Sequence, residues 1–197
     1  MLSSQLLGNF ILDIIKKLRG MKMLDDWNVL AIGEKDTERE LLKELEEDGE
    51  FERSGSRDVV IGRVEDIVEF LEDAENKKYP HLNRVIPIDD AFFVSPENLM
   101  AVLKRRIERY IDEIEPGETF GFRVERHGTK DDISSQAVES EVGGYFYDLI
   151  ENVYGRKPKM NLKNPDKLIA IEIVGDRCGI GFITKEMREK YSLIRVK

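Results

Sequence analysis

The sequence predicts a mixed α/β fold (α+β) in two parts, and two series of alternating elements carry this prediction. Over residues 29–88, apolar runs typical of strands alternate with amphipathic helical stretches in the order β-α-β-β-α-β, which is the ferredoxin-like order. In the second series a helix, a strand, another helix and an apolar hairpin follow one another, which indicates a second domain with a mixed sheet. A length of 197 residues is enough for two small domains with hydrophobic cores.

The composition is that of a folded protein with an uneven charge. The chain is 41% hydrophobic and 36% charged, which excludes the low hydrophobicity of disordered proteins. Its net charge is −9, but residues 1–80 hold 12 Lys/Arg against 20 Asp/Glu, whereas residues 151–197 hold 11 against 6. Because the acidity belongs mainly to the N-terminal part, the basic C-terminal part keeps nucleic-acid binding open.

The sequence also bears on location. A single cysteine, Cys178, rules out an intramolecular disulfide and favours a reducing compartment. No stretch approaches the roughly 20 apolar residues that a membrane-crossing helix needs. Residues 1–20 lack the basic leader and the small-residue cleavage site of a signal peptide. We therefore expect a cytoplasmic protein that does not contact a membrane.

Residues 2–19 predict an amphipathic helix that ends at Gly20, and we assign residues 1–22 to this segment. Its apolar stripe consists of Leu7, Ile11, Ile14 and Leu18. This face needs cover, either from its own domain or from a second copy of the chain, so a homodimer through the helix is one expectation. Met21 and Met23 leave open a natural start after this helix.

We assign the ferredoxin-like domain to residues 23–88. Its expected strands cover residues 29–32, 51–53, 59–63 and 84–88, and its expected helices cover residues 36–47 and 65–74. Asp36 or Thr37 can cap the first helix, because both side chains offer an oxygen to free backbone N–H groups. The acidic run over residues 46–50 is interpreted as a solvated helix end.

The second domain is assigned to residues 89–197. The expected elements are a helix opened by Ser95 as N-cap and Pro96, a strand over 119–125, a helix from Ser134 or Ser135 to Gly155, a strand over 160–162, a hairpin of 168–174 with 178–184, and a short basic helix over 185–190. Gly143 and Gly144 lie inside the second helix, where each costs about 1 kcal/mol relative to Ala. Such a cost predicts that another backbone, from a strand or from an RNA, comes close to them, and we favour a strand.

A phosphate-binding arrangement is expected where the strand over 119–125 gives way to the following helix. Four potential cations end the strand, namely Arg123, Arg126, His127 and Lys130. Ser134 or Ser135 can cap the helix, whose positive end attracts anions. Asn164 and Pro165 then make a sharp corner before an apolar strand.

Three patterns occur here in a fixed order: strand-R-x-x-R, then S-S-x-x-V-E-x-x-V-G, then N-L-K-N-P-D with an apolar strand after it. In this order they resemble the THUMP domain, an RNA-binding module of tRNA-modifying proteins. The resemblance implies contact with the acceptor end of tRNA. It also implies that the chain is similar to the stand-alone accessory factor of tRNA cytidine acetylation, whose partner is a separately encoded acetyltransferase.

By this resemblance, nine residues are expected to contact RNA. Arg123, Arg126 and Lys130 are expected at phosphates, Ser134 and Ser135 at the helix start, and Lys163 with Asn164 at the corner, with Lys157 and Lys159 as further candidates. Glu125 and the pair Asp131-Asp132 depart from a wholly basic surface, which weakens binding by this chain alone.

Catalytic patterns are scarce in the sequence. Gly179-Ile180-Gly181 lacks the third glycine of a dinucleotide loop, and Cys178 falls inside an apolar strand, as a structural thiol does. His81 and His127 lack metal-ligand spacing, and Asp89-Asp90 suits a turn or a cap.

We therefore expect a non-catalytic tRNA-binding adaptor without cofactor or metal, which presents tRNA to a separate modifying enzyme. The alternative is an acidic protein-interaction module with a degenerate THUMP domain that does not bind RNA. A small-molecule enzyme is the third hypothesis.

Overall fold

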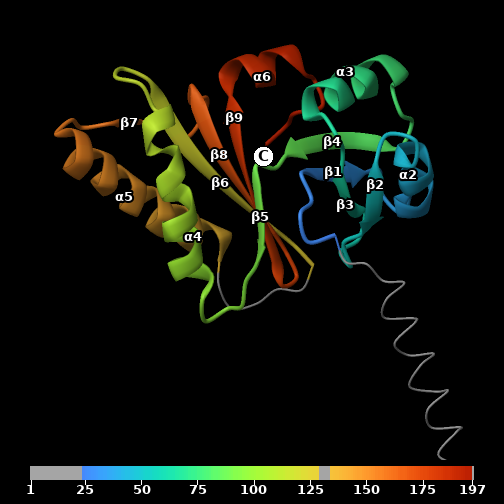
Figure 1. Ribbon diagram of the computed structural model, residues 1–197, viewed down its shortest axis with the longest axis horizontal. Coiled ribbons are helices and arrows are strands. Elements are labelled where there is room, and N and C mark those ends of the chain that lie inside the picture. Colours follow the sequence, from blue (N-terminus) through green and yellow to red (C-terminus); the bar gives the residue numbers. More distant parts are fainter. Residues whose placement is uncertain (1–23, 129–133, 197) are drawn as a thin grey trace, which may run out of the picture.

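The computed structural model describes residues 24–128 and 134–196, and Figure 1 shows its two sheets. The N-terminal part contains β1 (Val29–Gly33), α2 (Glu38–Leu45), β2 (Glu50–Arg53), β3 (Val59–Arg63), α3 (Ile67–Lys77) and β4 (Leu82–Pro87). These strands form an antiparallel sheet in the order β2-β3-β1-β4. This topology fits the ferredoxin-like arrangement that the sequence predicts. The expected helix over residues 2–19 lies outside the described residues.

The two helices of this part differ in their N-terminal caps. Asp66 caps α3, since its carboxylate accepts hydrogen bonds from the amides of Val68 and Glu69. Thr37 occupies the N-cap position of α2 but makes no side-chain cap, so this prediction is wrong. Its hydroxyl donates instead to the Glu34 carbonyl, at 2.8 Å.

The C-terminal part forms a mixed sheet, as predicted, and this sheet has five strands. Its elements are β5 (Asp90–Phe93), α4 (Leu99–Ile107), the 3₁₀ helix η1 (Glu108–Glu113), β6 (Thr119–His127), α5 (Ser135–Tyr154), β7 (Lys159–Met160), β8 (Lys167–Val174), β9 (Arg177–Thr184) and α6 (Lys185–Lys190). The strand order is β5-β9-β8-β6-β7, with β6 parallel to β7 and β8 and the other pairs antiparallel.

The start of this part differs from the prediction in two places. Strand β5 was not expected. Asp90 is its first residue instead of part of a turn, and its carboxylate forms an ion pair with Arg106 at 3.0 Å. Helix α4 begins after Asn98 rather than at Pro96. The reason is a turn over residues 95–98, in which the amide of Ser95 donates to the Asn98 side chain, so Ser95 is not the N-cap.

The glycine pair in α5 does not mark the close approach of another strand. A Cβ added to Gly143 would meet only side chains, Met160 at 3.4 Å and Phe122 at 3.5 Å, which are ordinary contacts. A Cβ added to Gly144 would meet nothing within 4 Å. The prediction that another strand comes close is therefore wrong, and a close approach of RNA stays a prediction.

Both faces of the five-stranded sheet are covered, by different kinds of structure (Figure 1). Helices α4 and α5 cover one face, where Phe146 makes edge-to-face contacts with Phe120 and Phe122 at centroid distances of 5.3 and 5.4 Å. The N-terminal sheet covers the other face and shares a hydrophobic cluster with Ala170 and Ile183.

Two glycines of β9 allow the N-terminal part to approach this second face closely. A Cβ on Gly179 would lie 2.4 Å from the Trp27 ring, and one on Gly181 would lie 2.0 Å from the Pro87 carbonyl oxygen. These glycines, which do not complete a dinucleotide loop, thus serve packing between the two sheets. The end of the chain returns to the first sheet as well, because the Val85 amide donates to the Leu193 carbonyl at 2.9 Å.

Across residues 24–128 and 134–196, none of the helices combines the length and apolar character that crossing a lipid bilayer requires.

Candidate nucleic-acid interface

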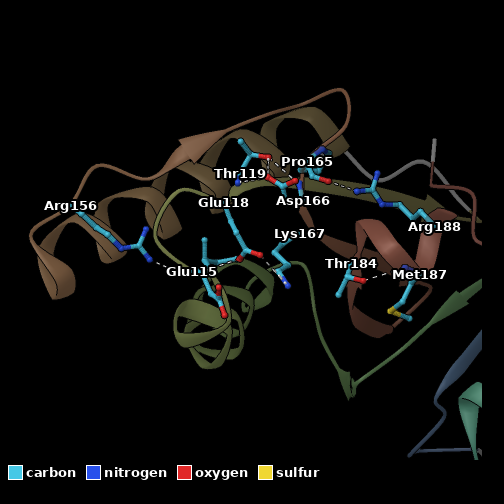
Figure 2. Close-up of polar contacts among 11 residues, drawn as sticks. Glu115, Glu118, Thr119, Arg156, Pro165, Asp166, Lys167, Thr184, Met187 and Arg188 are labelled. Carbon is cyan, nitrogen blue, oxygen red and sulfur yellow. Dashed lines mark hydrogen bonds and ion pairs between the residues drawn. The ribbon is translucent and has the colours of Figure 1, made fainter. Parts of the chain in front are cut away.

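A corner joins β7 to β8, and Figure 2 shows two of the contacts that hold it, from Arg188 to Pro165 and from Thr119 to Asp166. The side-chain oxygen of Asn161 accepts hydrogen bonds from the amides of Lys163 and Asn164, and its amide nitrogen donates to the Asn164 carbonyl at 2.8 Å. Arg188 of α6 donates to the Asn164 side chain at 3.0 Å and to the Pro165 carbonyl. The corner is therefore held from within and from a neighbouring helix.

Asp166 ties this corner to the start of β6. Its carboxylate accepts hydrogen bonds from the Thr119 hydroxyl at 2.6 Å and from the Thr119 amide at 2.8 Å (Figure 2). These donors stabilise the ionised form, so they hold the pKa of Asp166 below its usual range. Asp166 therefore connects the corner to the first residue of β6.

Exposed cations gather along the segment that leads into this corner. Lys157, Lys159 and Lys163 are exposed, and none forms an ion pair with any residue in the described ranges. Two apolar side chains accompany them at the surface, Met160 at 43% exposure and Leu162 at 53%. This combination of unpaired cations and exposed apolar groups lies along one edge of the sheet and suits a polyanion such as RNA.

Arg123 lies beside this basic edge but is already engaged. Its guanidinium pairs with Glu139 of α5 at 3.0 Å and donates to the Leu162 carbonyl. It also donates to the Phe122 carbonyl at 3.0 Å, while Glu139 accepts from the Val124 amide at 3.3 Å. Because β7 pairs only with the first residues of β6, this ion pair satisfies the backbone groups that β7 leaves open. Phosphate contact by Arg123 stays a prediction.

The start of α5 follows the prediction closely. Ser134 is the N-cap, and its hydroxyl accepts from the Ala137 amide at 3.0 Å. Ser135 is the first residue of the helix, and Gly155 ends it in the left-handed conformation. Arg126 is half-buried near the end of β6. Lys130 lies outside the described residues.

The structure therefore brings the predicted residues together in part. Lys163 and Asn164 share the corner, Arg123 reaches its backbone at Leu162, and Lys157 with Lys159 lies on the segment before it. Arg188 is the contributor that the sequence did not single out. The sequence predicts only a short basic helix over residues 185–190, and only the fold shows that Arg188 holds the corner.

Comparison with protein families agrees with this geometry. Residues 100–182 match the family model of the THUMP domain, a range that includes β6, α5, the three lysines and the corner. The chain contains a THUMP domain. Such a domain indicates RNA binding. A separate comparison with curated proteins finds no match.

Solved structures share the fold at low sequence identity. TrmN from Thermus thermophilus matches with a TM-score of 0.56 and 18% identity, over 79% of this chain and 44% of that chain. A possible methylase from Clostridium difficile 630 matches with a TM-score of 0.53 and 16% identity, over 79% and 40%. PH1313 from Pyrococcus horikoshii Ot3 matches with a TM-score of 0.51 and 17% identity, over 79% and 53%. This chain thus spans about half, or less, of the length of these proteins.

Proposed function

We propose that this chain is a non-catalytic tRNA-binding adaptor that presents tRNA to a separately encoded modifying enzyme. The observation that carries the proposal is the row of unpaired lysines, Lys157, Lys159 and Lys163, beside a fixed corner of the THUMP domain. Their positive charge can neutralise phosphates, while the corner keeps them in a constant arrangement.

The finer parts of the proposal come from the resemblance to the accessory factor of tRNA cytidine acetylation. They are contact with the acceptor end of tRNA, an acetyltransferase as the partner enzyme, and a cytoplasmic location. A homodimer through residues 2–19 belongs to the same set. One of the structural neighbours is described as a possible methylase, and the present chain covers 40% of it, which is compatible with a shared RNA-binding part and a separate reaction.

Titration of the purified full chain with tRNA at several salt concentrations tests the proposal. Each phosphate contact contributes about −0.7 to −0.9 to the slope of log affinity against log salt. Replacing Lys157, Lys159 and Lys163 by Ala should therefore make that slope shallower by about 2 to 3. Duplex DNA of similar length serves as the competitor, and tRNA is expected to bind more tightly.

A matched control removes the same charge elsewhere. Lys35, Arg39 and Lys43 are exposed on the N-terminal part and make no ion pair within the described ranges. Their triple Ala variant should bind tRNA as the parent does. Equal weakening by both triple variants would show that net charge, rather than the basic edge, controls binding.

The alternative function, an acidic protein-interaction module with a degenerate THUMP domain, is favoured by one observation. Arg123, the first cation of the predicted motif, is paired with Glu139. If the parent chain shows no tRNA binding at low salt, this alternative replaces the adaptor.

A further inference from the structure

A buried cluster of metal-binding side chains lies on the sheet face that meets the N-terminal part. Glu125 and His127 are two positions apart on β6, so both point to the same face. Glu172 is the register partner of Glu125 on β8. One ligand atom from each of the three residues lies within 4.8 Å of the other two.

Glu172 is the unusual member of this cluster. Its side chain is 1% exposed, and Oε2 lies 2.6 Å from Nε2 of His127. Its other oxygen, Oε1, is buried without a hydrogen-bond partner. A buried acceptor without a donor is costly unless another group meets it, so this oxygen points to a missing partner.

Arg84 of β4 completes the surroundings from the N-terminal part. Its guanidinium, 6% exposed at the side chain, donates to both oxygens of Glu125 and to the Arg195 carbonyl at 3.2 Å. Arg84 thus faces the cluster from the N-terminal sheet. Carboxylate oxygens have further lone pairs, and metal-ligating carboxylates are commonly hydrogen-bonded on their outer side, as Arg84 does here.

We propose that Glu125, His127 and Glu172 bind one divalent transition-metal ion, with Zn²⁺ as the best fit, between the two sheets. Imidazole nitrogen with carboxylate oxygen is a ligand set that Zn²⁺ accepts, whereas Mg²⁺ prefers oxygen alone. The ion would meet the unpaired oxygen of Glu172 and connect β6 and β8 to β4 through Arg84. This role is independent of RNA binding.

The ligand geometry requires a small adjustment. Bonds of about 2.1 Å place tetrahedral ligand atoms roughly 3.4 Å apart. The contact of 2.6 Å between His127 and Glu172 must therefore open, and the widest separation, up to 4.8 Å, must close. Rotation of the Glu125 side chain, which is 18% exposed, can close the wider separation, and a water molecule would be the fourth ligand.

Metal analysis of the purified full chain tests the proposal. After chelator treatment and dialysis against Zn²⁺, Mn²⁺ or Mg²⁺, we expect one equivalent of bound Zn²⁺, none of Mg²⁺, and a Zn²⁺-dependent rise in melting temperature, because a ligand of the native state stabilises it. His127→Ala and Glu172→Gln should both lose the bound Zn²⁺ and the rise. Glu172→Gln removes a buried charge and is therefore expected to fold.

The chain offers a matched control in a second His–Glu pair. Nδ1 of His81 lies 2.5 Å from Glu44, but no third ligand joins this pair within the described ranges. His81→Ala should keep the Zn²⁺ equivalent. The proposal is overturned if the parent binds no stoichiometric Zn²⁺, if either cluster variant retains it, or if His81→Ala loses it to the same extent.

Discussion

The two faces of the five-stranded sheet are covered in opposite ways. Under α4 and α5, aromatic and branched side chains fill the space, and Phe146 lies against Phe120 and Phe122. Under the N-terminal sheet, glycines replace side chains, and Glu172 and Arg84 are buried among the apolar residues. The helix face is thus stabilised by apolar volume, whereas the other face depends on close backbone fit and paired charge.

This difference has a physical basis. A helix presents side chains that interdigitate with those of a sheet, so large residues are favoured there. Two sheets that approach as closely as Pro87 and Gly181 leave no room for a Cβ. Substitutions that remove volume should therefore matter most on the helix face, and substitutions that add volume should matter most on the other.

The largest effect is expected from Phe146→Ala on the helix face. Phe146 is fully buried, and its removal leaves a cavity against two aromatic rings, so the free energy of unfolding should fall by about 3–5 kcal/mol. Denaturant unfolding measures this loss. Val153→Ala, at a position 53% exposed on the same helix, should change stability by less than about 0.5 kcal/mol. A loss below about 1 kcal/mol for Phe146→Ala would mean that this face does not depend on packed volume.

Gly181→Ala tests the opposite face, with a somewhat smaller effect. The added Cβ would collide with the Pro87 carbonyl oxygen, which is backbone and cannot rotate away, so the free energy of unfolding should fall by about 2–3 kcal/mol. Gly144→Ala is the control, because its Cβ meets open space inside a helix, and it should stabilise the protein by up to about 1 kcal/mol. A change in the free energy of unfolding with the same sign for both variants would contradict the close approach of Pro87 to Gly181.

The smallest effect on stability is expected at Asp166, which directly precedes β8. Its folded-state pKa lies below that of an unfolded Asp, about 3.9, because Thr119 donates to the ionised carboxylate. The stability from this contact is therefore present above about pH 4 and lost as pH falls through the folded-state pKa. Thr119→Val should move the pKa of Asp166 upward in an NMR titration. Thr37→Val, whose hydroxyl donates to a backbone carbonyl, should leave that titration unchanged.

Local signals in the sequence were sufficient for most helices and strands. The limits of α5 could be predicted at both ends, because Ser134 and Gly155 act on their own backbone. Strand β5 could not, because it pairs with β9, far along the chain, and begins with a charged residue.

The candidate sites show the same limit. Lys163 and Asn164 could be placed at a corner because Pro165 follows them, but the partner of Arg123 depends on how α5 crosses β6. The cluster of Glu125, His127 and Glu172 arises from the parallel register of two distant strands. A Glu inside the apolar run of β8 was the one sign of it in the sequence.

The ion pair of Arg123 and Glu139 has a consequence for the behaviour of the protein in concentrated solution. An open strand edge offers unpaired N–H and C=O groups, on which a second molecule can add a strand and begin aggregation. Beyond β7, the edge of β6 already donates from Val124 to Glu139 and accepts at Phe122 from Arg123. A two-residue edge strand followed by a side-chain pair thus protects the sheet against growth from one molecule to the next.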